Sequence, residues 1–173
     1  MKNFTLVTDE LTALIGRIDP LEFDQLIYAI THAGHIYLAG AGRSGQMVGA
    51  FANRLMHLGF TVSMVGEISS PHSRQNDLMI IGSGSGETQR LINQAGIAKK
   101  NGVRIALITT AGESTLARLA DCKLIIPATD SVQPMGTLFE QASLLVYDSI
   151  ILALMARLNE TADSMKRRHA DIE

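Results

Sequence analysis

The sequence predicts an α/β fold: a single doubly wound domain with a five-stranded parallel sheet flanked by helices. Five short, almost wholly apolar segments alternate with segments of helical periodicity, a pattern typical of parallel strands buried on both faces. The apolar residues are mainly aliphatic, because 46% of the chain is hydrophobic while only 5% is aromatic and Trp is absent. A length of 173 residues suits one core, so we expect residues 1–173 to form one domain.

The elements are expected in a regular order along the chain. A helix at residues 4–16 comes first, and a second begins at Asp19-Pro20, where Asp can cap the helix and Pro fits its first turn. The predicted strands are 35–39, 61–65, 78–81, 103–108 and 123–126. The connecting and final helices are expected at 43–58, from the turn after the third strand to about 100, at 116–120 and at 137–158. Right-handed crossovers between such strands give an open sheet that binds ligands at the carboxyl ends of its strands.

The charge and the cysteine content exclude several classes of protein. The net charge is −2, so no surface for nucleic acid or anionic lipid is expected. Cys122 is the single cysteine, which rules out an intrachain disulfide and fits a reducing cytoplasm, where we expect the protein. The five histidines are scattered without the spacing of metal ligands, so no metal site is expected.

The most apolar stretch, residues 138–155, is interpreted as a buried helix of a soluble protein. Glu140, Gln141 and Asp148 interrupt it, and a membrane span needs about 20 mostly apolar residues. Apolar side chains nevertheless surround most of this helix, more than one small domain can bury, so we expect part of it to lie in a subunit interface. These side chains are Leu144, Leu145, Val146, Ile150, Ile151, Leu152 and Leu154.

Two glycine-rich turns follow strands of the predicted sheet. The first, Gly-Ala-Gly-Arg-Ser-Gly at residues 40–45, opens a helix, and its glycines let the backbone approach a ligand closely. Taken alone, it has the G-x-G-x-x-G pattern of a dinucleotide site, and Glu67 lies at about the spacing of a ribose-binding acid.

The second turn, Ser-Gly-Ser-Gly-Glu-Thr at residues 83–88, favours a phosphomonoester instead. The hydroxyls of Ser83, Ser85 and Thr88 surround backbone N–H groups at another helix start. A dinucleotide fold has no need of this second cradle. Each turn by itself could be a tight turn with a Ser/Thr helix cap, but two at adjacent strand ends favour an anion site.

These motifs resemble the sugar isomerase (SIS) domain family, whose phosphate loop has the form S-x-S-G-E-T. Within that family the chain is similar to the 6-phospho-3-hexuloisomerases. The stretches that carry this similarity are Ala-Gly-Arg-Ser-Gly at 41–45, Arg-Leu-Met-His-Leu-Gly at 54–59, Val-Gly-Glu at 65–67 and Gln-Pro-Met-Gly-Thr-Leu-Phe-Glu-Gln at 133–141. The tail at 169–173 resembles the family's His-Ala-Asn-Leu-Glu and departs from it at Asp171 and Ile172.

The resemblance spans essentially the whole chain. It implies an SIS, flavodoxin-like fold and the interconversion of D-arabino-hex-3-ulose 6-phosphate and D-fructose 6-phosphate, within the ribulose monophosphate route of formaldehyde fixation. It also implies a phosphorylated ketohexose as the binding partner, a homotetramer, and neither a metal nor an organic cofactor.

An enediol mechanism needs a base for the C2 proton and an acid that moves protons at the two oxygens. Glu140 is the candidate base, although Thr137 and Glu140 also have the spacing of a capping box. His57 is the candidate acid, because imidazole titrates near neutral pH, or else it contacts the last carbonyls of its helix. His169, in the tail, is either solvated or closes a neighbouring subunit's site.

The other candidate residues bind the substrate. Arg43 and Ser44 can reach the phosphate or the sugar hydroxyls, since Arg suits oxyanions, with a surface charge as the alternative for Arg43. Gly42 and Gly84 supply backbone to the two turns. Glu67 can bind a sugar hydroxyl, act as an alternative base, or be a solvated loop acid.

Three other functions fit parts of this pattern. The chain could be a sugar-phosphate sensor that does not turn its ligand over, although no helix-turn-helix or basic segment is attached. A dinucleotide-binding oxidoreductase would use the first turn and leave the second idle. An aldose–ketose isomerase of phosphosugars would share the phosphate cradle.

Overall fold

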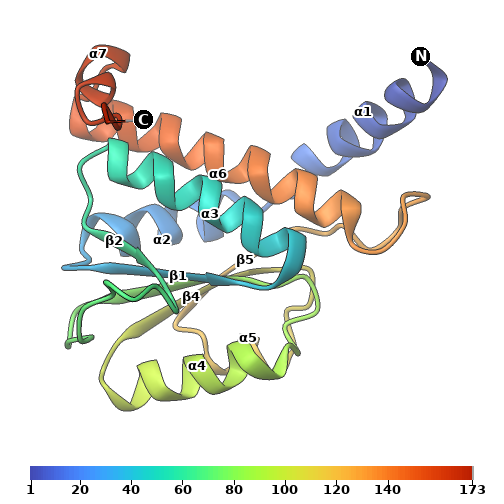
Figure 1. Cartoon of the computed structure of the whole chain (residues 1–173). Coiled ribbons are helices and arrows are strands. Elements are labelled where there is room, and N and C mark those ends of the chain that lie inside the picture. The colour runs from blue at the N-terminus through green and yellow to red at the C-terminus, as the bar shows by residue number, and fades with distance from the viewer. Residues whose placement is uncertain (173) are drawn as a thin grey trace.

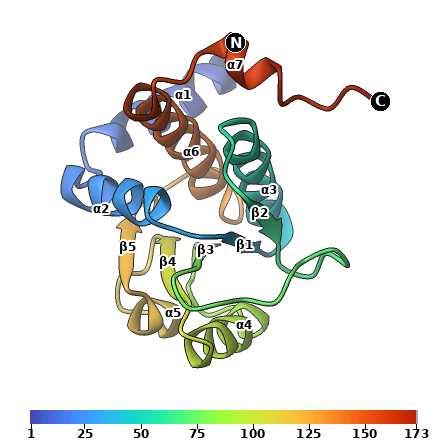
Figure 2. The same cartoon turned by 90° about the vertical axis from the view of Figure 1, so that its left-hand side faces the viewer.

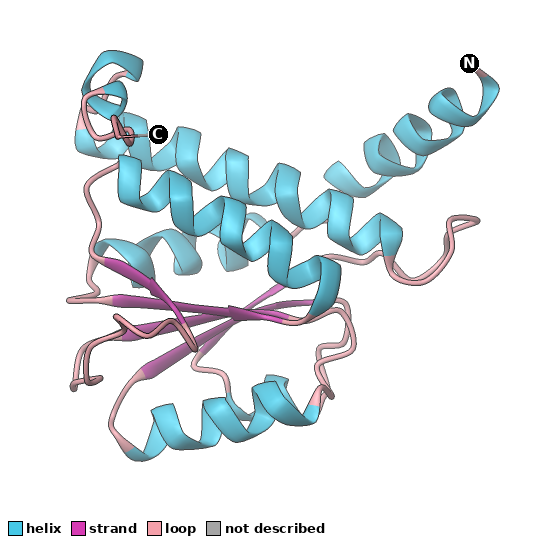
Figure 3. Cartoon of the chain, in the orientation of Figure 1, coloured by secondary structure: helices cyan, strands magenta, loops and turns pink. Residues whose placement is uncertain are grey.

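The computed structural model describes residues 1–172 and contains one sheet between layers of helices (Figure 3). The sheet has five strands in the order β2-β1-β3-β4-β5. The strands are β1 (Ile36–Gly40), β2 (Val62–Met64), β3 (Leu78–Gly82), β4 (Arg104–Thr109) and β5 (Cys122–Ile125). Every neighbouring pair is parallel. The predicted doubly wound parallel sheet is therefore confirmed, with strand ends shifted by at most one residue.

Helices cover both faces of this sheet (Figures 1 and 2). The helices are α1 (Lys2–Ile15), α2 (Pro20–Thr31), α3 (Gly42–His57), α4 (Gln89–Lys100), α5 (Thr115–Leu119), α6 (Thr137–Leu158) and α7 (Ala162–Lys166). Helices α4 and α5 lie on one face, while α2, α3 and α6 lie on the other. Alternate residues of each strand face opposite layers: Ile36 and Leu38 pack in the core with α3 and α6, whereas Tyr37 and Ala39 pack in the core with α4. This explains why the strands are apolar throughout.

Helix α6 is central to the thicker layer and packs against α1, α2 and α3. Among the described residues it is the one helix long and apolar enough to span a membrane, yet 50% of its most apolar window is buried inside the fold. Leu145 and Leu152 remain 48% and 66% exposed on it. Helix α1 runs from α6 out beyond the body of the domain (Figure 1), and Phe4 and Ile15 are exposed along it.

The C-terminal segment was not predicted and forms the short helix α7. Thr161 caps it, and the Thr161 and Ser164 side chains complete a capping box. Beyond α7, Arg168 donates to both carboxylate oxygens of Glu160 and to the carbonyl of His57. The bond to His57 joins Arg168 to the carboxyl end of α3, and beyond it the chain runs outward from the fold (Figure 2).

The strand order places the topological switch between β1 and β3. The chain leaves β1 toward the edge strand β2 and leaves β3 in the opposite direction, toward β4 and β5. Loops therefore diverge from the carboxyl ends of β1 and β3, where α/β sheets bind their ligands. Gly40 and Gly82, the last residues of these strands, are paired in register there.

Candidate functional site

A cleft of about 690 Å³ opens at this switch point. Its walls come from the turns after β1 and β3, from the end of β4, and from the start of α6. Its lining includes Ser44, Ser83, Gly84, Ser85, Thr88 and Glu140, which were all predicted as site residues. Segments more than 90 residues apart in the sequence thus meet in one cleft.

Three helices begin at this cleft, and none of them has a side-chain cap. Ala41, Thr88 and Gly136 are the N-cap residues of α3, α4 and α6, and each lacks a side-chain cap bond. By contrast, side chains cap α2, α5 and α7. Uncapped helix starts present unsatisfied N–H groups and the positive end of the helix dipole. Their convergence makes the cleft suitable for an anion.

The loop of residues 83–88 is the most polar wall of the cleft. The Ser83 Oγ accepts a bond from the Gly86 N–H at 3.2 Å, and the Ser85 Oγ accepts one from the Glu87 N–H at 3.2 Å. Each hydroxyl keeps its own hydrogen to donate to a ligand. Because Thr88 does not cap α4, its hydroxyl is likewise available. The loop therefore brings three hydroxyls to the cleft, as the sequence suggested, and its binding of a phosphate stays a prediction.

The turn of residues 40–45 needs glycine because its two ends touch. A Cβ on Gly40 would lie only 2.7 Å from the Cα of Gly45, so Gly40 has no room for a side chain, and a Cβ on Gly45 would lie 3.1 Å from the Gly40 carbonyl carbon. Helix α3 starts within this turn, at Gly42. Ser44 faces the cleft, while Arg43 reaches across it to α6.

Glu140 is directed to the cleft and not to its own helix start. The capping-box alternative is wrong, because Gly136 is the N-cap and the Thr137 hydroxyl donates to the Pro134 carbonyl at 2.6 Å. The Glu140 carboxylate instead accepts a bond from Arg43 Nη1 at 2.9 Å. Its side chain is 14% exposed, against 46% for Arg43. A half-buried carboxylate with one cationic partner thus stands beside the anion cradle.

The two predicted histidines lie together at the other end of α3. Their rings stack at a centroid distance of 5.2 Å, and His57 is buried. Arg54 Nη1 lies 3.2 Å from His57 Nδ1. Burial lowers the pKa of His57, and the nearby Arg54 and His169 lower it further. His57 is the last residue of α3, about 22 Å along the helix from Gly42, so it cannot reach the Glu140 of its own chain.

Glu67 also lies outside the lining of the cleft. Its carboxylate accepts a bond from the Met64 N–H at 3.1 Å, which turns it back onto the end of its own strand, β2. Its proposed contact with the sugar stays a prediction.

The sequence interpretation missed several lining residues. Thr110 follows β4, the strand next to β3, and the strand-end argument used for the two glycine turns could have located it. Phe139 packs on the loop so closely that a Cβ on Gly84 would lie 3.2 Å from its ring. Met135 stands exposed at the rim with φ = 62°, in the left-handed region that such a residue seldom adopts. No local signal marks that conformation.

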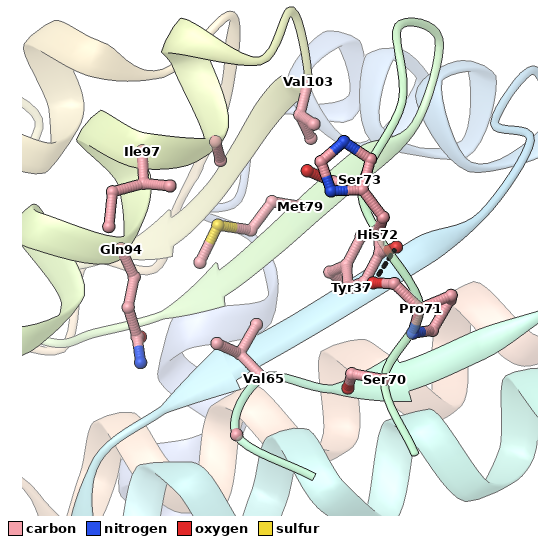
Figure 4. Close-up of a pocket in the computed structure, with 12 residues that line it drawn as sticks. Tyr37, Val65, Ser70, Pro71, His72, Ser73, Met79, Gln94, Ile97 and Val103 are labelled. Carbon is pink, nitrogen blue, oxygen red and sulfur yellow. Dashed lines mark hydrogen bonds between the residues drawn. The ribbon is translucent and has the colours of Figure 1, made fainter. Parts of the chain in front are cut away.

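A second cavity, of about 330 Å³, lies under α4 beside the edge of the sheet (Figure 4). Tyr37 and Met79 line it from the sheet, Val65 from the end of β2 and Ile97 from α4, while His72 stands at its loop side. It is mainly apolar, and neither a helix start nor a cationic Lys or Arg lines it. It therefore lacks the features that hold a phosphate.

Across residues 1–172, no group of three or more His, Cys, Asp or Glu lies together as metal ligands do.

Comparison with known proteins agrees with this geometry. The SIS domain profile matches residues 29–170. The 3-hexulose-6-phosphate isomerase of Bacillus subtilis is 42% identical over 96% of this chain and 95% of its own. The enzyme of the same name from Mycobacterium gastri is 39% identical over 99% of this chain and 90% of its own.

A solved structure from Methanococcus jannaschii, for which the function of 3-hexulose-6-phosphate isomerase was inferred, superposes with a TM-score of 0.90. It is 32% identical, and the match covers 100% of both chains. The chain therefore belongs to the SIS domain family, and within it to the group of the 3-hexulose-6-phosphate isomerases.

Proposed function

We propose that this protein interconverts D-arabino-hex-3-ulose 6-phosphate and D-fructose 6-phosphate through an enediol. One observation carries the proposal: three uncapped helix starts and a half-buried carboxylate, Glu140, share one cleft at the switch point. An anion site beside a base is what a phosphosugar isomerase requires. The identities of 42% and 39% to enzymes of that name support the particular substrate.

The substrate phosphate is proposed to lie on the loop of residues 83–88. Hydroxyls of Ser83, Ser85 and Thr88 donate to its oxygens, together with backbone N–H groups of the loop. Ser44 and the backbone at Gly42 close the cradle from the start of α3. Arg43, which is already at 2.9 Å from Glu140, binds a sugar or phosphate oxygen.

Glu140 is the proposed base. Its carboxylate takes the proton from C2 of the 3-ketose, the C2 electron pair forms the enediol double bond to C3, and the C3 oxygen is protonated. Return of a proton to C3, with loss of the proton on the C2 oxygen, gives the 2-ketose. The proton count is unchanged, and no oxidant or cofactor is needed. A positioned base contributes roughly 10²–10⁴-fold to such a rate.

The proton transfers at the oxygens are assigned to His57, supplied with His169 by another copy of the chain. Within one chain the histidine pair and Glu140 stand at opposite ends of α3, so a shared site needs two chains. The exposed apolar residues of α1 and α6 support association. Leu11, Leu14, Ile15, Leu145 and Leu152 line a mainly apolar groove of about 540 Å³ between these helices. We propose a cytoplasmic homotetramer without a metal or organic cofactor.

Solvent exchange tests the reaction. Purified protein is incubated with fructose 6-phosphate in D₂O and followed by NMR. We expect deuterium at C3 of fructose 6-phosphate and appearance of the 3-hexulose, while Glu140→Gln binds the sugar without exchange. Asp24→Asn, an exposed acid on α2, is the control and should behave as the wild type. Exchange at C1 with an aldose product would instead indicate an aldose–ketose isomerase, and binding without exchange would indicate a sensor.

Mixed oligomers test the assignment of His57. Glu140→Gln and His57→Asn chains are each expected to be inactive. When the two are unfolded and refolded together, roughly a quarter of the sites regain both residues, because each residue is intact in half of the chains. If mixing restores no activity, the histidine does not act from a second copy.

A further inference from the structure

The carbonyl of Gly84, in the middle of the phosphate loop, accepts three hydrogen bonds. The Thr110 hydroxyl donates at 2.8 Å, the Thr109 hydroxyl at 3.0 Å and the Thr110 N–H at 3.1 Å. A carbonyl oxygen has two lone pairs and most accept one or two bonds. This peptide is therefore held unusually firmly for one that lies in a loop.

The direction of the carbonyl determines the direction of the next N–H. The Gly84 carbonyl and the Ser85 N–H belong to one planar trans peptide, so they point in opposite directions. With the carbonyl fixed on β4 and the residue after it, the Ser85 N–H is aimed away from β4, and it donates to no acceptor within residues 1–172. A fixed donor loses no orientational freedom when an anion binds.

Other parts of the loop are tied to the same neighbouring segment. The Leu116 N–H donates to the Gly86 carbonyl at 3.1 Å, and the Thr115 N–H donates to a Glu87 carboxylate oxygen at 2.7 Å. The backbone bond to Thr115 is the main cause that lowers the pKa of Glu87. The segment from the end of β4 into α5 thus holds the carbonyl groups of the loop, whereas the Ser85 N–H donates to no acceptor within residues 1–172.

We propose that Thr109 and Thr110 are positioning residues that preorganise the phosphate loop, so that their hydroxyls determine substrate affinity through the Gly84–Ser85 peptide. The inference rests on the proposed function, because it assumes that the loop binds the substrate phosphate. Thr109 distinguishes a positioning role from direct contact with the substrate. It is fully buried, with 0% of its surface exposed, and acts only through the protein, whereas Thr110 lies in the cleft wall.

The test compares Thr109→Val and Thr110→Val with Thr109→Ser and Thr110→Ser. Valine has the same shape but lacks the hydroxyl, and serine restores it. We expect each valine variant to raise KM about tenfold, the effect of losing one hydrogen bond, with kcat within about twofold of wild type. Each serine variant should recover most of the affinity. Calorimetry with fructose 6-phosphate should show the same order of Kd.

Thr31→Val is the control, because the Thr31 hydroxyl bonds to its own helix, α2, away from the cleft. Valine variants that fold and bind with wild-type KM and Kd would overturn the inference. The Thr109 hydroxyl also accepts from the Ala111 N–H at 3.1 Å. If Thr109→Val does not fold, Thr110→Val decides the matter through hydrogen exchange of the Ser85 amide in the free protein, which is faster only if the hydroxyl acts through the peptide. A wild-type protein that fails to bind fructose 6-phosphate would refute the proposed function, and binding that is equal in all variants would refute only this inference.

Discussion

Arg43 Nη1 lies 2.9 Å from Glu140 Oε2, which joins the first turn of α3 to the first turn of α6 across the cleft. Arg43 is one residue from the N-terminus of α3, and Glu140 is three residues from that of α6. The pair holds the candidate base beside the cradle in the free protein. In the proposed reaction, the same pair presents an arginine that is already oriented for the substrate.

Replacing Arg43 should affect the substrate more than the fold. The Arg43 side chain is 46% exposed, and exposed ion pairs contribute about 0–1 kcal/mol. Arg43→Met should therefore leave the midpoint of urea unfolding nearly unchanged while raising KM for fructose 6-phosphate about tenfold or more, since an arginine–oxyanion contact is lost. Arg157→Met, in the last turn of α6, is the matched control. Unchanged KM in Arg43→Met would mean that the arginine only balances the charge of Glu140.

Gly86 should tolerate no side chain. Its φ is +64°, and a Cβ there would overlap the Ser114 hydroxyl and lie 2.5 Å from the Ser114 Cβ. We expect Gly86→Ala to destabilise the protein by about 1–3 kcal/mol, the cost of a strained backbone position, and to weaken phosphate binding. Gly49→Ala, in the interior of α3 with open space around it, should instead stabilise by roughly 0.5–1 kcal/mol. Urea unfolding of the two variants measures both changes in the free energy of unfolding. Equal stability of Gly86→Ala and Gly49→Ala would contradict a strained backbone at Gly86.

Acid should destabilise the protein through His57. Burial, together with Arg54 and His169, keeps the folded-state pKa of His57 below its ordinary value near 6.5. The unfolded chain therefore binds the proton more readily, so stability falls as the pH drops below about 6.5 and levels off below the lowered folded pKa.

His57→Asn cannot take up this proton and should lose part of the pH dependence of stability below about pH 6.5. The measurement is urea unfolding at several pH values. The exposed His72 provides the control as His72→Asn, which should keep the wild-type pH dependence. Identical pH profiles for the wild type and His57→Asn would rule out this role of His57.

The sequence predicted those parts of the site that depend on local rules. Apolar strands and the strand-end rule located the loops of residues 40–45 and 83–88, because parallel strands bring their carboxyl ends to one edge. Helix geometry alone would also have placed His57 a full helix length from Arg43. What remained unpredictable depends on contacts between distant segments.

The start of α6 is one example. The spacing of Thr137 and Glu140 is that of a capping box, yet the helix begins one residue earlier than that box requires, with Gly136 as its N-cap. The partner of Glu140 is 97 residues away, so no local pattern reveals it. The same holds for the threonine bonds to Gly84, which join β4 to a loop 25 residues earlier.

Glu10 of α1 holds the loop that leads into α6. Its two carboxylate oxygens accept bonds from the Ser131 hydroxyl at 2.9 Å, the Val132 N–H at 2.9 Å and the Gln133 side-chain amide at 2.7 Å. The Gln133 bond, followed by the Val132 bond, lowers the pKa of Glu10. A lowered pKa means that this carboxylate stabilises the fold above the ordinary pKa of Glu, about 4.3, and that the contribution is lost as the pH falls through the folded pKa.

Glu10→Gln should therefore loosen this loop at neutral pH, because an amide has one acceptor oxygen where the carboxylate has two. We expect faster hydrogen exchange at the Val132 amide, and a KM raised severalfold, because Met135 and Gly136 at the end of the same loop line the cleft. Asp9→Asn, the exposed neighbour on α1, should change neither quantity. If Val132 exchanges at the wild-type rate in Glu10→Gln, the loop is held by its own packing and α1 does not control the cleft.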